Sequence, residues 1–409
     1  MKVEEKSFVR ENFQANITNC NEFPPSLERH IRNIIIKEGY TKYSVNKREI
    51  CTNGGNYLAS LYEIDIKGTT QKGKKETNIF IKKMKPGENS MKIISIPEAY
   101  KFETFAYEEL LKIYTELQNE AKVPADERFK AVKDFGEFDA QAIILENLVK
   151  KGYKTAHRMD IVSLEYAEMA IKQLAKFHAL SFALRERKPE YYESKIKTIP
   201  SRLNLGNEWN GFVKSMQALT LNFLNDNLRK KVENILPRLF ENITDYFEGS
   251  DSAVCCLCHG DFRPNNIMMK EIDGEISETI PIDYQLIYYG CPIIDFLYFI
   301  FTATDKEFRR AHLTHLKTLY YDTMQNFLEY FDISIESVYS KTGFDNDYKK
   351  KLDYGLIVTI LYCPFMFVDE NDVPDITEAD LGNISFTLHD KYKDKIQGTV
   401  EDFIEWGLI

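Results

Sequence analysis

The sequence has no surplus of positive charge and no long apolar segment. It contains 53 lysines and arginines against 63 aspartates and glutamates, which gives a formal net charge of −10. Proteins that bind nucleic acid or an anionic membrane surface usually carry a basic surplus, so this balance argues against both partners. A membrane-spanning helix needs about 18 consecutive apolar residues, and the sequence contains no such run.

The beginning of the sequence lacks the apolar stretch of a secretory signal peptide. The 7 cysteines are odd in number and scattered through a long acidic chain, which is typical of reduced thiols rather than of a disulfide framework. These features together predict a soluble, cytoplasmic protein.

Linkers rich in proline, glycine or serine, internal repeats and low-complexity tails are also missing. Apolar residues make up 44% of the chain and charged residues 28%, which permits a packed core and excludes wholesale disorder. A length of 409 residues then favours two or three domains or lobes.

Two strands and a solvated loop are expected in the first part of the chain. Residues 57–66 alternate between apolar and polar, and residues 78–84 are apolar and β-branched. Both patterns are typical of strands. The polar stretch 67–77 between them predicts a loop that faces water.

A helix and two further strands follow. Ser95 begins the capping-box sequence Ser-Ile-Pro-Glu, and helical spacing continues to about residue 119. Residues 129–137 and 140–145 again have strand character. Residues 40–148 therefore predict a small α+β unit.

The second part of the chain has a helical pattern from about residue 159. Residues 163–184, 219–247 and 315–331 carry apolar residues at three- and four-residue spacing. Residues 253–283 interrupt this pattern with a polar loop and two strand-like runs around an Asp-Gly turn. A β-hairpin in such a place indicates that it positions a functional group.

The polar loop carries the strongest chemical signal in the sequence. It reads His-Gly-Asp-Phe-Arg-Pro-Asn-Asn over residues 259–266, and Asp283 follows the hairpin. Phosphoryl transfer needs a carboxylate beside the attacking hydroxyl and oxygen ligands for Mg²⁺. Asp261 would orient the hydroxyl, while Asn266 and Asp283 would hold the metal.

A buried ion pair is expected in the first part of the chain. Lys82 closes an apolar strand, where a charge is costly unless it is paired. Glu103 lies on the apolar stripe of the predicted helix, with Tyr107 four residues later. An ion pair between Lys82 and Glu103 would offset the cost of burying each of the two charges. It would also direct the ammonium group of Lys82 towards the phosphates of a nucleotide. Lys83, on the opposite face of the strand, is the alternative lysine.

The cysteines just before the loop need a separate reading. Residues 255–259 read Cys-Cys-Leu-Cys-His, which fits the pattern of c-type haem attachment. That chemistry requires export and a free histidine, and neither is expected here. A zinc site would need further ligands, and none is suitably spaced. The expected role of these cysteines is to fill a buried strand.

Taken in order along the chain, these motifs resemble the ecdysteroid kinase-like family, also called CHK kinase-like, of the aminoglycoside and choline kinase superfamily. The matching segments are Gly54-Gly-Asn-Tyr57 with Ser60, Ile79-Phe-Ile-Lys82, Glu103-x-x-x-Tyr107, Leu145-Glu-Asn-Leu148, Leu174-Ala-Lys-Phe-His-Ala179, the 259–266 loop, Ile282-Asp-Tyr-Gln285 and Asp295-Phe-Leu-Tyr298.

The resemblance implies an α+β, bilobal protein-kinase-like fold that uses ATP and Mg²⁺. The small nucleotide-binding lobe, with a helical N-terminal extension, would span residues 1–148, and the mainly helical lobe with the catalytic loop residues 149–409. Two segments of the small lobe would contact the nucleotide. They are Gly54, Gly55 and Asn56, which suit either close approach of the backbone to phosphate or an ordinary tight turn, and Glu146 to Leu148, whose backbone would meet adenine.

Two positions depart from the family pattern. Arg263 stands where tryptophan is common, and the segment that ends the last strand of the small lobe reads Glu-Asn rather than Glu-Asp. Neither change removes a phosphate or metal ligand. Arg263 is expected to alter the acceptor site.

The acceptor is expected to be a small molecule, because no Ala-Pro-Glu signature or long activation segment follows Asp283. The resemblance implies a steroid alcohol of the ecdysteroid type or a lipophilic xenobiotic. A choline- or aminoglycoside-type acceptor and a catalytically silent binding protein are the alternatives. The aromatic residues after the loop suit either an acceptor pocket or the core; they are Tyr288, Tyr289, Phe365 and Phe367. The sequence leaves the oligomeric state open.

Overall fold

The computed structural model describes residues 25–50, 59–84, 95–139, 142–200, 207–241, 243–247, 254–369, 384 and 386–409. Packing divides the chain into two compact units. The first contains Met1–Thr52, Ala59–Lys85 and Lys133–Lys151, and the second contains Asn53–Leu58, Pro86–Val132 and Gly152–Ile409. The last segment of the first unit ends at Lys151, which is close to the expected boundary at residue 148. Residues 86–132, by contrast, belong to the second unit. The division into two functional lobes stays a prediction.

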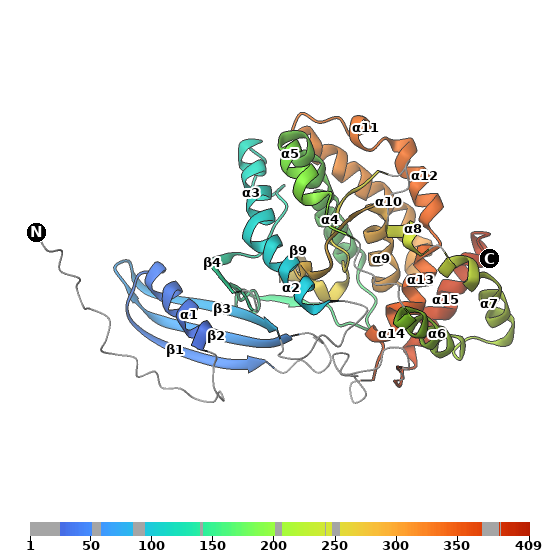
Figure 1. Cartoon of the computed structure of the whole chain (residues 1–409), viewed down its shortest axis with the longest axis horizontal. Helices are drawn as coiled ribbons and strands as arrows, with labels where there is room; N and C mark the ends of the chain where they lie inside the picture. The colour runs from blue at the N-terminus through green and yellow to red at the C-terminus, as the bar shows by residue number, and fades with distance from the viewer. Residues whose placement is uncertain are drawn as a thin grey trace, which may run out of the picture. The chain divides into compact units, whose positions relative to one another are not determined.

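The first unit is a five-stranded antiparallel sheet with a helix packed on it (Figure 1). Its strands lie in the order β1-β2-β3-β5-β4. The elements are α1 (Pro25–Lys37), β1 (Tyr40–Ile50), β2 (Ala59–Thr70), β3 (Gly73–Met84), β4 (Asp134–Asp139) and β5 (Ala142–Glu146). Apolar residues of α1, such as Ile31 and Ile34, share one buried cluster with Ile64 and Ile79 of the sheet. This burial of aliphatic surface holds the helix to the strands.

The hairpin between β2 and β3 is tighter than the sequence predicts. β2 continues to Thr70 and β3 begins at Gly73, so most of the stretch 67–77 is strand, and the expectation of a loop there is wrong. Residues 40–50, to which the sequence pattern assigns no element, pair with β2 along their length. Backbone hydrogen bonds to a neighbouring strand stabilise polar segments that show no apolar alternation of their own.

A buried carboxylate links α1 to β4. Glu137 accepts hydrogen bonds from His30 Nδ1 at 2.8 Å, from Asn33 Nδ2 at 3.0 Å and from Lys37 Nζ at 2.6 Å. Burial by itself would raise the pKa of Glu137, but these partners outweigh it and lower the pKa to about 2. The ionised form therefore stabilises the fold.

We expect Glu137→Gln to lower the free energy of unfolding at pH 7 by roughly 2–3 kcal/mol. The folded pKa of about 2 lies below the ordinary value of 4.5, so the stabilisation is present above pH 4.5 and is lost as the pH falls towards 2. Urea denaturation across this pH range should show the difference between the wild type and the variant vanish at the acidic end. Glu28→Gln is the control: this glutamate also forms an ion pair, with Lys47, but its side chain is 39% exposed.

The second unit is mainly helical and carries two small sheets, β7 with β10 and β6-β8-β9. Its helices are α2 (Ile96–Phe105), α3 (Leu111–Glu120), α4 (Leu164–Arg187), α5 (Pro189–Tyr191), α6 (Asn207–Leu221), α7 (Asp226–Glu241), α8 (Thr244–Phe247), α9 (Ile293–Ala303), α10 (Lys306–Glu329), α11 (Ile335–Val338), α12 (Lys341–Lys351), α13 (Tyr354–Leu361), α14 (Cys363–Met366) and α15 (Lys391–Glu405). Its strands are β6 (Tyr153–Thr155), β7 (Cys256–Cys258), β8 (Ile267–Ile272), β9 (Glu275–Pro281) and β10 (Tyr288–Gly290).

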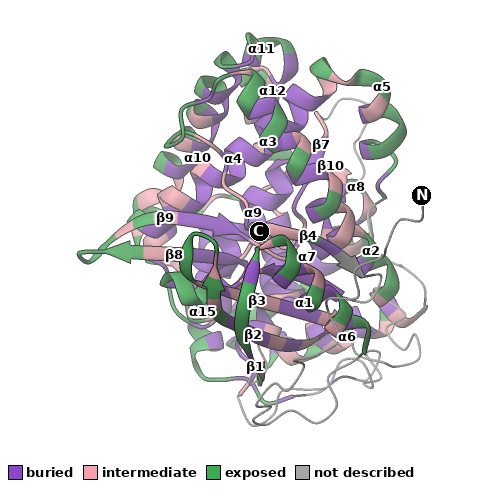
Figure 2. Ribbon diagram, turned by 90° about the vertical axis from the view of Figure 1, so that its left-hand side faces the viewer, coloured by how far each residue is buried: buried purple, intermediate pink, exposed green. Residues whose placement is uncertain are grey.

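The core of this unit is built around α4 and α9 (Figure 2). Every residue of α9 is buried, as expected of a helix that is apolar all round. α4 begins at the expected place, because Ser163 caps it by accepting a hydrogen bond from the N–H of Tyr166. α10 packs along α4.

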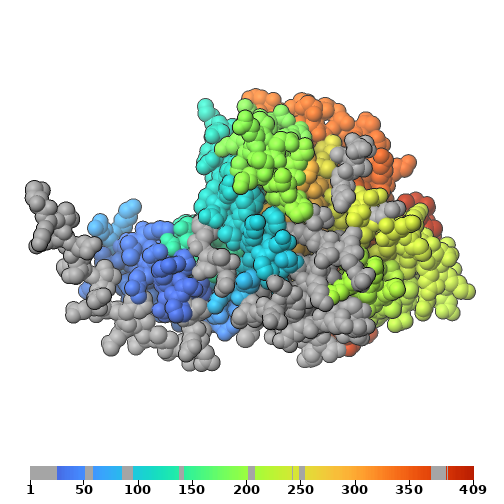
Figure 3. All heavy atoms as spheres, viewed as in Figure 1, coloured from blue at the N-terminus to red at the C-terminus, as the bar shows by residue number. Residues whose placement is uncertain are grey.

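The expected helix over residues 219–247 is broken into separate helices. α6 ends at Leu221, α7 begins at Asp226 and α8 is a single turn. α7 is amphipathic: it buries Leu228, Val232 and further leucines, and its opposite, polar face lies at the surface, where it is drawn in yellow-green in Figure 3. Apolar spacing that continues across a turn does not reveal the break.

The hairpin and the capped helix follow the sequence closely. β8 and β9 pair around Asp273 and Gly274, whose φ angles of 54° and 88° are those that an Asp-Gly turn favours. α2 begins after Ser95, which accepts a hydrogen bond from the N–H of Glu98. The helix passes into α3 through a π-helical turn over Ala106–Leu110. Within the described part of the chain, no helix is long and apolar enough to cross a bilayer.

Candidate active site

The polar loop begins where β7 ends, and its backbone requires glycine at residue 260. Gly260 has a φ of +80°, and a Cβ atom there would lie 2.0 Å from the carbonyl oxygen of Leu286. A side chain at this position would therefore be both strained and blocked. The close approach of the two backbones holds the loop against the segment that follows Asp283.

Asp295, at the start of α9, holds the backbone of the loop in place through hydrogen bonds. Its carboxylate accepts hydrogen bonds from the N–H of His259 at 2.5 Å and of Gly260 at 2.9 Å. It also accepts one from Nε2 of His178 at 3.2 Å, and Nδ1 of His178 then accepts from the hydroxyl of Tyr320 at 2.7 Å. Asp295 therefore braces the loop, and His178 is a core histidine with both ring nitrogens engaged.

His259 braces the loop in its neutral form. The N–H of Asp261 lies 3.4 Å from Nδ1, so Nδ1 is the acceptor and Nε2 carries the proton that is donated to the carbonyl of Ile282 at 3.1 Å. Burial lowers the pKa of His259, although Asp295, Asp261 and Asp283 act in the opposite direction. The imidazole ring of His259 therefore positions the loop and does not act as a general acid or base.

Asp261 lies at the centre of a ring of donors. Its carboxylate accepts from the hydroxyl of Tyr298 at 2.8 Å and from Nδ2 of Asn266 at 2.7 Å. Nε of Arg263 lies 3.0 Å from one carboxylate oxygen and 3.2 Å from the other. The sequence indicates the pairing of Asp261 with Asn266, but not the contacts with Tyr298 and Arg263. Tyr298 follows Asp295 by three residues on α9, so the two side chains share one face of that helix.

Asn266 and Asp283 meet at the end of the hairpin. The N–H of Ile282 donates to the carbonyl of Asn266 at 2.9 Å, which brings Asp283 alongside the loop. The amide nitrogen of Asn266 donates to the backbone carbonyl and to the carboxylate of Asp261, so its Oδ1 remains an acceptor. Asp261 and Asp283 both act to raise the pKa of Arg263, against the effect of its burial. The two carboxylates therefore share one neighbourhood, as the spacing predicts.

The turn that contains Asp283 packs against α2 and the π-helical turn after it. The ring of Tyr284 lies between Tyr107, at a centroid distance of 5.4 Å, and His259, at 5.0 Å. Burial raises the pKa of Tyr107 well above its usual value, and the carboxylates of Glu103 and Asp283 add to this. Glu103 therefore lies near Asp283, a proximity that the sequence did not indicate.

The predicted nucleotide-binding residues of the first unit lie on its strands. Lys82, on β3, is buried with 7% of its surface exposed, whereas Lys83 beside it is only partly buried. Glu146 ends β5 and pairs with Nζ of Lys151 at 2.5 Å, and Leu148 is buried just after it. The predicted glycine segment lies outside the described residues; it consists of Gly54, Gly55 and Asn56.

The cysteines before the loop line the core. Cys256 and Cys258 are fully buried on one face of β7 and lie with His178 in a group whose ligand atoms are within 4.8 Å of one another. This histidine comes from α4 and not from the Cys-Cys-Leu-Cys-His segment itself. However, both nitrogens of His178 already have partners, and burial raises the pKa of Cys258 well above its usual value. Neutral thiols and an engaged imidazole fit the expected packing role better than a zinc site.

Most of the aromatic residues proposed for an acceptor pocket belong to the core. Tyr288 and Phe367 are each 3% exposed, and their rings pack on Phe247 and Tyr392 respectively. The other two, Tyr289 and Phe365, are partly buried and also contact rings, those of Tyr192, Phe212 and Phe386. The aromatic side chain that does reach Asp261 is Tyr298, whose ring makes an edge contact with Tyr362 at 5.4 Å.

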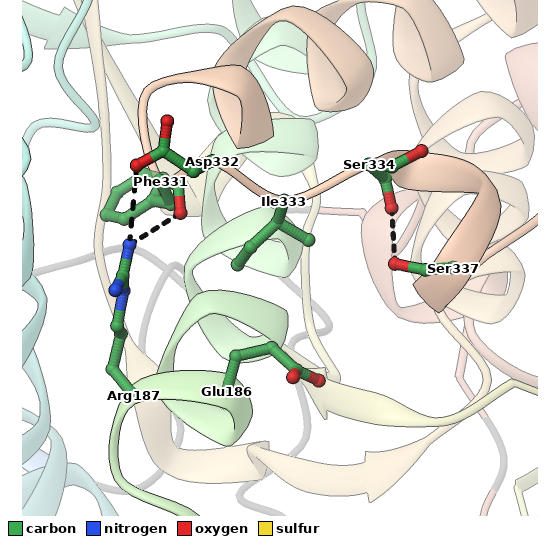
Figure 4. A pocket seen from close by; sticks show the side chains of 7 residues that line it. All are labelled: Glu186, Arg187, Phe331, Asp332, Ile333, Ser334 and Ser337. Carbon is green, nitrogen blue, oxygen red and sulfur yellow. Dashed lines mark hydrogen bonds and ion pairs between the residues drawn. The ribbon is translucent and has the colours of Figure 1, made fainter.

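A separate pocket of about 290 Å³ lies at the end of α4, beside the turn that joins α10 to α11 (Figure 4). In it, Arg187 donates to the carbonyl of Phe331 at 2.6 Å and Ser337 donates to the carbonyl of Ser334 at 2.7 Å. The remaining lining residues are Glu186, Asp332 and Ile333. The lining includes none of the predicted site residues, so the pocket is not part of this site.

Comparison with protein families matches residues 53–333 to the model described as the ecdysteroid kinase-like family. The match covers well over half of the chain and includes the loop, the hairpin and Asp283. A comparison with curated proteins finds no match.

Solved structures give weaker similarities. The aminoglycoside phosphotransferase APH(3'')-Id from Streptomyces rimosus is 11% identical, and the alignment covers 75% of this chain and 97% of that chain with a TM-score of 0.35. The GDP and kanamycin complex of APH(2")-IIia is 13% identical, with 80% and 96% covered and a TM-score of 0.37. The family of the chain is shown by the match over residues 53–333.

Proposed function

The chain belongs to the ecdysteroid kinase-like family and is a kinase-type phosphotransferase of small molecules, and from this premise we propose that it transfers the γ-phosphoryl group of ATP to a hydroxyl of a lipophilic alcohol. The proposed acceptor is an ecdysteroid-like steroid or a xenobiotic. The observation that carries the proposal is the arrangement at the loop, where Asn266 contacts Asp261 and the hairpin brings Asp283 alongside.

Asn266 and Asp283 would hold Mg²⁺. Amide and carboxylate oxygens are ligands that Mg²⁺ prefers, and the Oδ1 atom of Asn266 is kept as an acceptor by the two hydrogen bonds that its nitrogen donates. When bound there, the cation would neutralise charge on the β- and γ-phosphates. These residues therefore fit the metal that the proposed reaction needs.

Asp261 would orient the acceptor hydroxyl and take its proton during direct in-line transfer. The donors around its carboxylate hold it in one orientation, and His259 and Asp295 hold the backbone on which it is mounted. Positioning of this kind supplies most of the catalysis in phosphoryl transfer. No covalent enzyme intermediate is required.

Lys82 would steady the α- and β-phosphates, with Glu103 as its carboxylate partner. Both are charged residues in buried positions, 7% and 2% exposed, where each needs a partner of opposite charge. The greater burial of Lys82 favours it over Lys83. Gly54, Gly55 and Asn56, together with the backbone from Glu146 to Leu148, remain the proposed contacts to the rest of the nucleotide.

The acceptor can be identified by mass spectrometry. The protein would be incubated with Mg-ATP and a mixed library of sterols, other lipophilic alcohols, aminoglycosides and choline. We expect a steroid or another lipophilic alcohol to become heavier by one phosphoryl group, and omission of Mg²⁺ should abolish the product. Phosphorylation confined to choline or to aminoglycosides would contradict the proposed acceptor, and no product from any compound would contradict the proposed reaction.

A further inference from the structure

The proposed base, Asp261, has a cation bound to it. Nε of Arg263 contacts both oxygens of the Asp261 carboxylate, at 3.0 and 3.2 Å. A guanidinium group carries its charge at every pH at which a protein is folded. The negative charge of Asp261 is therefore offset by a fixed positive charge in direct contact with it.

The rest of the guanidinium group is available to a ligand. Arginine has five N–H donors, of which Nε supplies only one. Among the described residues, the two terminal nitrogens of Arg263 donate no hydrogen bond. The Arg263 side chain is 23% exposed, so these nitrogens are not sealed in the core. Donors in this state bind carbonyl or anionic oxygens well.

We propose that Arg263 selects the acceptor of the proposed kinase reaction: it favours alcohols that carry a carbonyl or anionic oxygen near the reacting hydroxyl and rejects alcohols that carry an amine there. The inference rests on the proposed function and narrows its acceptor class. The ring of Tyr298, whose hydroxyl donates to Asp261, makes an edge contact with the ring of Tyr362, so aromatic surface lies close to the carboxylate.

An ammonium group on the acceptor would interact with two opposite charges, those of Asp261 and Arg263. Without Arg263, an ammonium group next to the hydroxyl would be attracted to Asp261. With Arg263 in place, an ammonium group beside its terminal nitrogens would lie nearer to the guanidinium group than to the Asp261 carboxylate, so repulsion would outweigh attraction. At a separation of about 6 Å and an effective dielectric constant of about 20, the repulsion corresponds to roughly 100-fold in affinity. Partial exposure of Arg263 reduces the expected discrimination to roughly 10- to 100-fold.

The test uses three alcohols on one steroid skeleton, with a carbonyl, a carboxylate or a primary amine next to the free hydroxyl. Values of kcat/KM would be measured from the phosphorylated product. Wild-type protein should disfavour the amine by roughly 10- to 100-fold. Arg263→Gln removes the charge and leaves Asp261 to attract the ammonium group, so it should abolish this discrimination or reverse it in favour of the amine, whereas Arg263→Lys should retain most of it.

The control is Arg229→Gln, which removes an exposed arginine that pairs with Glu233 on α7 and should leave the preference unchanged. Thermal unfolding of each variant verifies that it is folded. An equal fall in kcat/KM for all three alcohols in Arg263→Gln would assign Arg263 to the phosphates or to support of Asp261 and would overturn the inference, as would a wild-type preference for the amine. If the wild type phosphorylates other library alcohols but not these three, the inference alone fails; if it phosphorylates nothing, the proposed function fails with it.

Discussion

Replacing Asp261 with asparagine should reduce turnover by at least roughly 100-fold, and by as much as roughly 10,000-fold, while ATP still binds. Asparagine keeps the size of the side chain but cannot accept the proton of the acceptor hydroxyl. The new side chain should stay in place, because its carbonyl oxygen can accept from Asn266 while its amide group donates to the hydroxyl of Tyr298, which can also act as an acceptor. Turnover would be measured on the alcohol identified by mass spectrometry, and ATP binding by thermal stabilisation in the presence of Mg²⁺.

The matched control is Asp273→Asn at the tip of the hairpin. Asp273 has a φ of 54°, a conformation that asparagine also adopts readily, so this variant should keep normal activity. Wild-type turnover in Asp261→Asn would remove Asp261 from the mechanism. The comparison separates a loss of chemistry from a general effect of replacing an aspartate in this part of the chain.

The same measurements address the silent-kinase alternative. A protein that only binds nucleotide would be stabilised by Mg-ATP but would form no phosphorylated product with any acceptor and would hydrolyse no ATP. Asp261, Asn266 and Asp283 are all present, and two backbone devices hold them together: the glycine at residue 260 and the hydrogen bond between Ile282 and Asn266. A site maintained in this detail favours catalysis over binding alone.

Features determined by a few adjacent residues were predicted well from the sequence. The cap at Ser95 and the Asp-Gly turn at residues 273 and 274 each depend on the chemistry of one short segment. The hairpin then follows, and with it the position of Asp283 near Asn266. This part of the candidate site could therefore be placed before the structure was considered.

Features that depend on distant neighbours were missed or predicted wrongly. The polar stretch 67–77 becomes strand because β2 and β3 pair along their whole length, and residues 40–50 become strand because β2 lies beside them. Such backbone pairing leaves little trace in the pattern of side chains. The break between α6 and α7 was missed because apolar spacing continued across it.

The surroundings of Asp261 show the same limit. Tyr298 comes from α9 and the brace on Asp295 includes His178 of α4, so neither contact can be derived from the loop sequence alone. Arg263 was noted as a departure from the family pattern, but its contact with Asp261 required coordinates. Sequence spacing thus indicated the residues that we propose for the chemistry, whereas tertiary packing determines their charge environment and hence the acceptor class that we infer.

Replacing Asp295 with alanine should destabilise the protein by roughly 3–5 kcal/mol and also abolish turnover. The Asp295 residue is 1% exposed, and its carboxylate accepts from His259, Gly260 and His178. Alanine would leave all of these donors buried without an acceptor, and the loop that carries Asp261 would lose its support. The free energy of unfolding would be measured in urea, and turnover at a temperature where the variant remains folded.

The free energy of unfolding and the turnover of Asp295→Asn should lie between those of Asp295→Ala and the wild type. The carbonyl oxygen of asparagine can still accept from some of the three donors, while its amide group opposes the others. Asp160→Ala is the control, since Asp160 pairs with Lys391 on the surface and both side chains are more than half exposed. That change should cost less than about 1 kcal/mol. If Asp295→Ala proved as mild as the control, the catalytic loop would not depend on α9 for its position, and the support that we ascribe to Asp295 would have to come from Gly260 and its contact with Leu286.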